Sequence, residues 1–420
     1  MRSQLVQAQR VPLYGWLVAE AISLVGTRLS MVALPWFVLT TTGSATKTGL
    51  VALAEMLPLV VFKVLGGPIV DRVGARRVSI TCDLASVVAV GAIPLLYDAG
   101  HLSFVGFLAL VAVAGALRGP GDGAKQALVP TLVRHANVPM ERATGLHSTV
   151  ERSAGMLGYA AAGALIALVG PAQALLVDAV SFGLAAAVLA WSTPSLPRVD
   201  REAAEDEGPY LAQLRAGWTY LRRDRLLLGL ALMIAVTNLL DLAWSAVLAP
   251  VWAQESGGGA EALGLMFAVF AGASALGSLT AAAWAARLPR FRVYVLAFLI
   301  VGAPRFVIFA LGVPLWVILA ASVVTGFASG FLNPVLGAVA YERIPPALVG
   351  RVTALMTSLC YAGMPVGGLL GGLLVSGVGL PLALVTCGAA YFLATMAPAV
   401  LPAFREMDRR PAPAAPTPFM

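Results

Sequence analysis

The chain has 420 residues, of which 59% are hydrophobic and only 12% are charged, and its formal net charge is +7. About a quarter of the residues of an average soluble domain are charged, so this composition excludes an ordinary water-soluble globule and indicates a protein embedded in lipid. The positive charge gathers in no basic stripe or soluble domain, which argues against a nucleic-acid partner.

Twelve segments are long and apolar enough to cross a bilayer, since a transmembrane helix needs about 20 mostly apolar residues. The predicted spans are residues 14–40, 48–70, 77–97, 103–128, 145–169, 171–192, 226–251, 261–286, 293–313, 314–338, 352–376 and 380–401. The loops on one side carry the arginines, whereas the opposite loops hold Lys47 and no arginine. Because basic loops stay in the cytoplasm, we predict an all-α, multi-pass membrane protein with both termini cytoplasmic.

The short loop between the second and third predicted spans, residues 66–77, reads GGPIVDRVGARR. It resembles the cytoplasmic loop between helices two and three of the major facilitator superfamily, whose pattern is roughly G-x-x-x-D-R-x-G-R-R. Ala75 stands where the family usually has a basic residue. The alternative is an ordinary positive loop between membrane helices. The resemblance implies a solute transporter with two six-helix bundles and a substrate site between them.

Asp71 of this loop has two predicted partners. One is the basic end of the fourth span, where Arg118 to Lys125 form a bent, charged helix end, and the other is the N-terminus of the eleventh span at Arg351. A carboxylate at a helix N-terminus is stabilised by about 0.3–1 kcal/mol. We therefore predict a conformational latch that closes the cytoplasmic side in the outward-open state. Its residues are Gly67, Asp71, Arg72, Gly74, Arg76, Arg77 and Arg351.

An internal repeat divides the chain into two halves. With an offset of 209 residues, the fifth and eleventh spans align, and Arg142 meets Arg351. The fifth span resembles the glycine-rich element of the antiporter branch of the superfamily, G-P-x-x-G-G, with Tyr159 in place of the proline. Small residues let helix backbones approach closely, so we predict a tight seam between the halves, with ordinary helix packing as the alternative. The predicted seam residues are Gly158, Gly163, Gly367 and Gly372.

The predicted domains follow from this division. They are an N-terminal bundle (1–192), a cytoplasmic central loop (193–225), a C-terminal bundle (226–403) and a cytoplasmic tail (404–420). Within the central loop, Leu211, Leu214, Trp218 and Leu221 recur at helical spacing. This pattern predicts an amphipathic helix on the cytoplasmic lipid surface.

The resemblance implies that spans one, four, seven and ten line the cavity. Asp241 lies about 15 residues into the seventh span and, at about 1.5 Å per residue, near the bilayer midplane. Asn238, Asp241 and Trp244 share one broad helix face, which suits a cationic or amphiphilic molecule. Alternatively, Asp241 pairs structurally with Arg28 or Arg118. The candidate cavity residues are Arg28, Arg118, Asp122, Asn238, Asp241, Trp244 and Asn333.

Ionisable side chains inside a membrane are costly and need a reason, so they mark candidate functional sites. Asp241, Glu55 and Glu151 are the predicted proton carriers, in that order. Asp83 and Asp178 are interpreted as structural. Arg305 follows Pro304 within the ninth span, and the sequence leaves a kink, a paired charge and an anionic-substrate contact equally open.

Stretches such as SLVGTRLSMVALPWFVL in the first span and GRVTALMTSLCYAGMPVG at the eleventh resemble bacterial Tap-type multidrug efflux proteins and, more loosely, macrolide and enterobactin exporters. This resemblance implies a drug:proton antiporter of the bacterial cytoplasmic membrane that exports small amphiphilic molecules as a monomer. Many relatives have an acid at the position of Thr27, where this chain has none. Export or import of one metabolite, such as a siderophore or sugar, is the alternative.

Other kinds of chemistry find little support. The three cysteines and three histidines show no metal-ligand spacing, so no metal is predicted. No nucleophile lies beside a base, which argues against a membrane enzyme, and no signalling domain suggests a receptor. A GxxxxGK[ST] loop is missing, which argues against ATP-driven pumping. The proton gradient as energy source, without a cofactor, is what the resemblance to the exporters implies.

Overall fold

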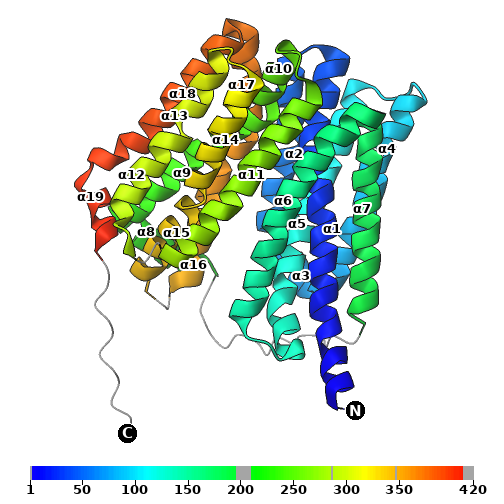
Figure 1. Ribbon diagram of the computed structural model, residues 1–420. Helices are drawn as coiled ribbons and strands as arrows, with labels where there is room; N and C mark the ends of the chain where they lie inside the picture. Colours follow the sequence, from blue (N-terminus) through cyan, green and yellow to red (C-terminus); the bar gives the residue numbers. More distant parts are fainter. Residues whose placement is uncertain (1, 195–209, 285–286, 346–347, 410–420) are drawn as a thin grey trace.

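The computed structural model describes residues 2–194, 210–284, 287–345 and 348–409, which are helical apart from short turns. Twelve spans in these ranges are long and apolar enough to cross a membrane, as predicted. They form two six-span bundles that stand side by side, with the first and last described residues at the same end (Figure 1). We call this the terminal end, and the opposite one the loop end. Residues 195–209 of the predicted central loop, 285–286 of the eighth predicted span and 410–420 of the predicted tail lie outside the described residues.

The N-terminal bundle consists of six spans and one short connecting helix. Its helices are α1 (Arg2–Thr42), α2 (Ala45–Leu65), α3 (Gly67–Val73), α4 (Ala75–Asp98), α5 (Phe104–Ala136), α6 (Met140–Val169) and α7 (Pro171–Ser192). The second span ends at Leu65 instead of residue 70, because Gly66 and Pro68 start the separate helix α3. The fourth span continues beyond residue 128 to Ala136, through two internal prolines.

The C-terminal bundle differs because four of its spans are interrupted. Its helices are α9 (Arg225–Ala243), the π-turn η1 (Trp244–Leu248), α10 (Ala249–Glu255), α11 (Gly259–Trp284), α12 (Arg290–Val301), α13 (Ala303–Ala310), α14 (Leu315–Ser329), α15 (Leu332–Arg343), α16 (Val349–Ala362), α17 (Met364–Val378) and α18 (Leu380–Met396). The ninth and eleventh spans break at Gly302 and Gly363, each followed two residues later by a proline, which cannot continue the helical hydrogen bonding. Broken helices are typical of the membrane-embedded sites of transporters.

The two bundles meet tightly at the loop end. The start of α11 packs on the end of α6: a Cβ atom added at Gly163 would lie 2.9 Å from the Ala260 carbonyl oxygen and 3.2 Å from Gly264 Cα. In the counterpart contact, the start of α2 packs on α17, and a Cβ at Gly372 would lie 2.5 Å from the Ala45 carbonyl oxygen. Only glycine allows backbones to approach this closely.

The other two predicted seam glycines lie inside their own bundles instead. A Cβ at Gly158 would lie 2.7 Å from Arg28 Cβ on α1, and one at Gly367 would collide with the Leu239 carbonyl on α9. Positions 209 residues apart therefore make the same kind of contact in the two halves: one pair packs within a bundle, and the other packs between bundles. Gly170 and Gly379 even share one backbone conformation, with φ of 87° and 80°.

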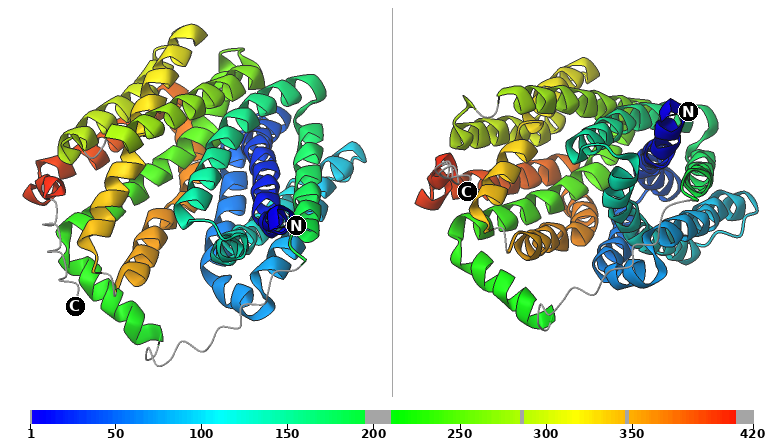
Figure 2. Two further views of the ribbon diagram at one scale, coloured as in Figure 1. Left: turned by 60° about the horizontal axis from the view of Figure 1, so that its bottom comes forward. Right: turned by 90° about the horizontal axis from the view of Figure 1, so that it is seen from below.

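Helix α8 (Tyr210–Arg223) occupies the predicted amphipathic segment, beside the C-terminal bundle at the terminal end (Figure 2). Leu221 is fully buried with Leu227 and Val352, and Gly217 approaches the side chain of Leu355 on α16. Trp218 keeps 38% of its surface exposed. The helix therefore packs part of its apolar face on protein, and its contact with the lipid surface stays a prediction. The side chains of Leu211 and Leu214 lie outside the described part of the structure.

Candidate functional site

A cavity of about 540 Å³ lies between the bundles. The N-terminal bundle contributes α1 and α6 to its wall, while α9, η1, α11 to α15 and α18 supply the rest. Toward the loop end its lining is buried, as at Phe309 and Ile318, whereas Glu151 and Asn333 toward the terminal end are exposed. The cavity is therefore sealed at the loop end and accessible from the terminal end.

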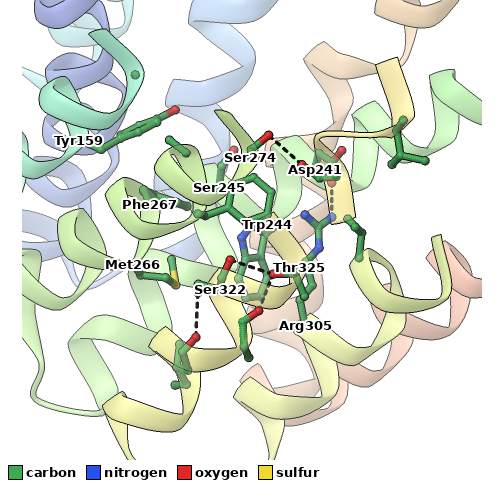
Figure 3. A pocket seen from close by; sticks show the side chains of 18 of the residues that line it. Tyr159, Asp241, Trp244, Ser245, Met266, Phe267, Ser274, Arg305, Ser322 and Thr325 are labelled. Atoms are coloured by element: carbon green, nitrogen blue, oxygen red, sulfur yellow. Dashed lines mark hydrogen bonds and ion pairs between the residues drawn. The ribbon is translucent and has the colours of Figure 1, made fainter. Parts of the chain in front are cut away.

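Asp241 and Arg305 form an ion pair inside this cavity (Figure 3). Arg305 lies on α13, just after the break at Gly302, and Asp241 lies on α9. The arginine is the more deeply placed partner, with 13% of its side chain exposed against 41% for Asp241. Of the three interpretations that the sequence left open for Arg305, the structure shows the paired charge. Neither Arg28 nor Arg118, the alternative partners of Asp241, makes this pair.

Aromatic rings enclose the Arg305 guanidinium on several sides. Its carbon lies 4.8 Å from the ring centroid of Phe306, 4.9 Å from that of Tyr391 and 5.6 Å from that of Trp244. Each such cation–π contact contributes about 0.5–2 kcal/mol, depending on desolvation. The Trp244 ring also packs edge-on against Phe309, with centroids 4.4 Å apart. One side of the cavity is thus a rigid aromatic surface around a neutralised charge pair.

The π-turn η1 aims Trp244 into this surface. The N–H of Ala249 donates to the carbonyl oxygen of Trp244, five residues earlier, instead of to the fourth residue before it. Pro250 follows directly and has no N–H to donate, so an α-helical bond at this turn is already missing. Single π-turns of this kind are frequent at functional sites.

Arg28 stands on the opposite wall and makes no ion pair among the described residues. Its Nη1 lies 3.5 Å from the Tyr159 hydroxyl and 3.4 Å from Met31 Sδ, both weak contacts for a guanidinium. Its buried Nε has no hydrogen-bond partner. Arg28 is therefore a cation in the cavity wall with unused hydrogen-bonding capacity.

Hydroxyl groups of α11 and α14 also line the cavity. Ser274 and Ser329 lie 3.1 Å apart, oxygen to oxygen, and bring α11 and α14 together. Ser322 and Thr325 donate back to carbonyl groups of their own helix, α14. These oxygens can accept hydrogen bonds from a bound molecule.

Three predicted cavity residues do not line the cavity. Arg118 donates to Glu55 at 2.7 Å, which binds α5 to α2. Asn238 donates its amide to the Cys360 carbonyl oxygen at 3.0 Å and so joins α9 to α16. Asp122 lies on α5, one turn before Lys125. Arg118 and Asn238 are each directed toward a polar partner within their own bundle, which spacing on one helix does not reveal.

The predicted proton carriers occupy three different environments. Asp241 is paired inside the cavity, and Glu151 lies at the exposed rim next to Arg152. Glu55 lines a smaller pocket of about 80 Å³ between the bundles, which shares Tyr159, Ser245 and Phe267 with the main cavity. No single cluster unites the three.

A buried polar cluster in the N-terminal bundle went unpredicted. Lys125 on α5 is 1% exposed, and its Nζ lies 3.1 Å from Asp83 Oδ2 and 2.9 Å from Ser23 Oγ. Glu20 on α1 is 7% exposed and interacts electrostatically with Lys125. A lysine within an apolar helix was an available signal, because the chain has only three lysines. The interpretation of Asp83 as structural fits its pairing, and Asp178 likewise accepts hydrogen bonds from Ser30 and Ser181.

The predicted latch residues lie at the terminal end. Gly74 has a φ of 96°, which favours glycine, and it separates α3 from α4. Arg76 donates to the Thr193 hydroxyl and the Ala190 carbonyl, both at 2.9 Å, and thereby ties α4 to the end of α7. The remaining positions lie on both bundles: Gly67, Asp71, Arg72 and Arg77 on the N-terminal bundle and Arg351 on the C-terminal one. The latch itself stays a prediction.

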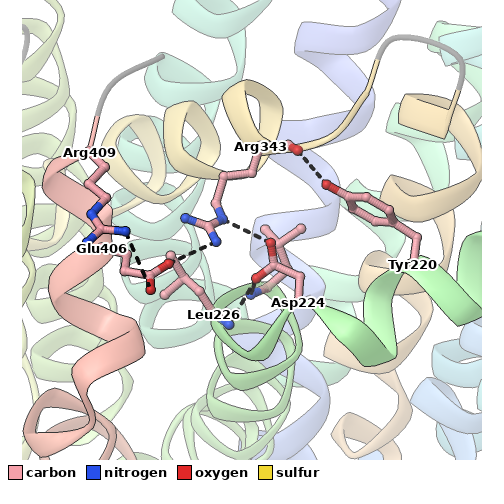
Figure 4. A network of polar contacts seen from close by, with 7 residues as sticks. Tyr220, Asp224, Leu226, Arg343, Glu406 and Arg409 are labelled. Atoms are coloured by element: carbon pink, nitrogen blue, oxygen red, sulfur yellow. Dashed lines mark hydrogen bonds and ion pairs between the residues drawn. The ribbon is translucent and has the colours of Figure 1, made fainter. Parts of the chain in front are cut away.

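A second ionic network holds the terminal end of the C-terminal bundle together (Figure 4). Arg343 on α15 pairs with Asp224 at 2.9 Å and with Glu406 at 3.1 Å. Asp224 also accepts hydrogen bonds from the first backbone N–H groups of α9, and Tyr220 on α8 donates to the Arg343 carbonyl at 2.6 Å. The network joins α8, α9, α15 and the segment after α19 (Pro402–Arg405).

Comparisons with known proteins agree with this architecture. The model of a family described as transmembrane secretion effector matches residues 9–420. The multidrug efflux pump Tap of Mycobacterium tuberculosis is 31% identical over 415 residues, covering 96% of both chains, and Tap of Mycolicibacterium fortuitum is 30% identical over 413 residues, covering 96% of this chain and 99% of that one. The solved nucleoside transporter NupG has a TM-score of 0.72 at 13% identity, covering 94% of this chain and 98% of NupG. That likeness shows the fold alone.

Proposed function

This chain belongs to the transmembrane secretion effector family of the major facilitator superfamily, and we propose that it exports small amphiphilic molecules, drugs and antibiotics among them, in exchange for protons. The observation that carries the proposal is a cavity between two bundles that is sealed at one end and accessible from the other. A passage that opens to one side at a time is what alternating access requires.

The orientation of the protein in the membrane rests on the placement of arginine. The loops of the terminal end hold the arginines, which supports a terminal end that faces the cytoplasm of a bacterial cell and a cavity that substrate enters from inside. We propose that the molecule works as a monomer in the cytoplasmic membrane and without a cofactor. Rocking of the bundles would then separate Gly163 from Ala260 and Gly372 from Ala45, while the loop with Asp71 approaches Arg351.

The lining of the cavity supports an amphiphilic substrate. Trp244, Phe267 and Phe309 offer ring faces and edges to an apolar body, and the hydroxyl groups of Ser322 and Thr325 lie nearby. Asp241 is already neutralised by Arg305, so a simple organic cation finds no free acid at that depth. Arg28 instead offers donors to an acceptor or anionic group on the substrate.

Inside-out membrane vesicles test this proposal. With an acidic lumen, vesicles that contain the protein should accumulate members of a panel of unrelated amphiphiles, such as an acridine, an anthracycline and a rhodamine, and an uncoupler should abolish the accumulation. Vesicles without the protein are the control. Accumulation of a single chemical class would favour the metabolite exporter, and accumulation that ignores the pH gradient would overturn proton exchange.

A further inference from the structure

The buried cluster of Glu20, Asp83 and Lys125 lies apart from the cavity and is built from three helices of the N-terminal bundle. Glu20 belongs to α1, Asp83 to α4 and Lys125 to α5, and their exposed fractions are 7%, 4% and 1%. None of the three lines the cavity between the bundles. Ionisable groups buried this deeply in a membrane protein are costly unless they pair or serve a function.

Lys125 is held at the centre of the cluster from two sides. Its ammonium lies 3.1 Å from Asp83 and 2.9 Å from the Ser23 hydroxyl, and its backbone carbonyl accepts a hydrogen bond from the Trp16 indole at 3.1 Å. Trp16, Glu20 and Ser23 are spaced at three and four residues, so they form one stripe of α1 that faces α5. Glu20 therefore sits between two residues that contact Lys125 directly.

The charges of this cluster do not balance. One ammonium faces two buried carboxylates, and Asp122 on α5 adds a third acid within electrostatic reach of the lysine. Asp83 forms an ion pair with Lys125 at 3.1 Å, whereas Glu20 has no ion pair or hydrogen bond among the described residues. An unpaired buried carboxylate costs several kcal/mol, and binding one proton removes that cost. We propose that Glu20 is the residue that binds and releases the transported proton, with the Lys125–Asp83 pair as its positioning groups.

Glu55, Asp241 and Glu151, the carboxylates predicted to carry protons, are less suited to this role. Glu55 has Arg118 at 2.7 Å, and Asp241 has Arg305, so each already has its own counter-charge. Glu151 is exposed at the rim of the cavity, where water solvates its charge. Glu151 does lie within electrostatic reach of Glu20, which gives the buried cluster a neighbour on the cavity surface.

The groups facing Glu20 suggest how its proton affects transport. The Lys125 ammonium lies 3.1 Å from Asp83 and 2.9 Å from Ser23, so one fixed positive charge stands on this side of the cluster. His147 on α6 stacks on Trp16 at 5.0 Å between ring centroids. When Glu20 loses its proton it competes with Asp83 for Lys125, which pulls on α1, the helix that carries Arg28 two turns farther along.

This inference rests on the proposed proton exchange, so its first test needs no substrate. Infrared difference spectra of the purified full-length protein should show the carbonyl band of a protonated carboxylic acid. Glu20→Gln should remove the component of that band that Glu20 contributes, whereas Glu20→Asp and Asp98→Asn should keep a component there. Asp98 is a suitable control because it accepts a hydrogen bond from Gln173 at an exposed site remote from the cluster. A band of unchanged shape and intensity in Glu20→Gln would overturn the proposal.

Transport supplies the second readout. In vesicles with an acidic lumen, Glu20→Gln should lose accumulation of a rhodamine that the unchanged protein concentrates, but should keep exchanging external for internal rhodamine without a gradient. Glu20→Asp should restore part of the accumulation. Normal gradient-driven accumulation in Glu20→Gln would refute the role of Glu20 but would remain consistent with proton exchange by the protein. If the unchanged protein shows no gradient-driven accumulation, the proposed function is refuted. The infrared result would still show whether Glu20 binds a proton. A monodisperse elution profile on size-exclusion chromatography shows that each variant is folded.

Discussion

Replacement of Gly163 by alanine tests how the two bundles are held together at the loop end. The added Cβ would lie 2.9 Å from the Ala260 carbonyl oxygen and 3.2 Å from the Cα atoms of Glu261 and Gly264. All three neighbours are backbone atoms, so the strain can be relieved only by moving α11 away from α6. We therefore expect the substitution to disfavour the state in which the loop end is closed.

Its magnitude follows from the cost of overpacking. Inserting one methyl group into a well-packed contact costs typically about 1–3 kcal/mol. If the strain is absent when the bundles separate, the equilibrium between the two states shifts by about 5- to 150-fold toward the state open at the loop end. Gly372→Ala, at the pseudo-symmetric contact with Ala45, should act in the same direction.

Two other glycines of α6 provide matched controls. A Cβ at Gly155 would meet only Ala271 Cβ at 3.9 Å, so Gly155→Ala should leave the equilibrium between the two states unchanged. A Cβ at Gly158 would lie 2.7 Å from Arg28 Cβ within the same bundle, so Gly158→Ala should lower stability without separating the bundles. The three substitutions are chemically identical and lie within eight positions of one another.

Electron–electron distance measurements between spin labels report the separation. Leu168 at the end of α6 and Glu255 at the end of α10 are exposed and belong to different bundles, so cysteines there can be labelled after the native Cys82, Cys360 and Cys387 are replaced. Gly163→Ala should raise the population with long distances. An unchanged distribution, or an equal response to Gly158→Ala, would refute the reasoning.

Three further predictions concern polar contacts. Arg305→Leu should lower the free energy of unfolding by about 1–2 kcal/mol, measured by thermal unfolding. This is less than the loss of a fully buried pair would cost, because Asp241 is 41% exposed and partly solvated. An unchanged midpoint of thermal unfolding would contradict the prediction. Arg343→Leu should speed hydrogen exchange in Tyr210–Arg223 through a loss of about 1–3 kcal/mol of local stability; exchange as slow as in the unchanged protein contradicts it. Arg28→Gln should weaken equilibrium binding of anthracene-9-carboxylate by about 10- to 100-fold and leave anthracene-9-methanol unaffected; equal effects on both would show that Arg28 recognises no charge.

The fold could be predicted from the sequence because membrane spans have a strong and local signature. All twelve spans, their antiparallel order and the repeat follow from apolar length, arginine-bearing loops and an offset of 209 residues. Helix boundaries were less accurate where glycine or proline allows more than one local structure, as at Gly66 and Pro130. The sequence contains the glycine and proline residues at the breaks at Gly302 and Gly363. Whether a membrane helix continues past a proline, however, depends on the neighbouring helices.

The site was harder to predict because its pairs join distant parts of the chain. Asp241 and Trp244 were expected in the cavity and lie there, yet the partner of Asp241 is Arg305, 64 residues away. Asn238 shares a helix face with Asp241 on a helical wheel, but its amide donates a hydrogen bond to the Cys360 carbonyl oxygen on another helix. Residue spacing gives the direction of a side chain to within a broad sector, and the neighbouring helices decide the rest.

The π-turn η1 at Trp244–Leu248 limits which insertions and deletions this helix can tolerate during evolution. A π-turn accommodates one residue more than an ordinary helical turn, so the segment after it is rotated relative to the segment before it. Loss of a single residue there would turn Ala249–Glu255 by about 100° and move Trp252 off the ring of Phe309, which it now contacts at 4.7 Å between centroids. New ligand preferences at this position should therefore arise by exchanging side chains, whereas insertions and deletions should be eliminated by selection.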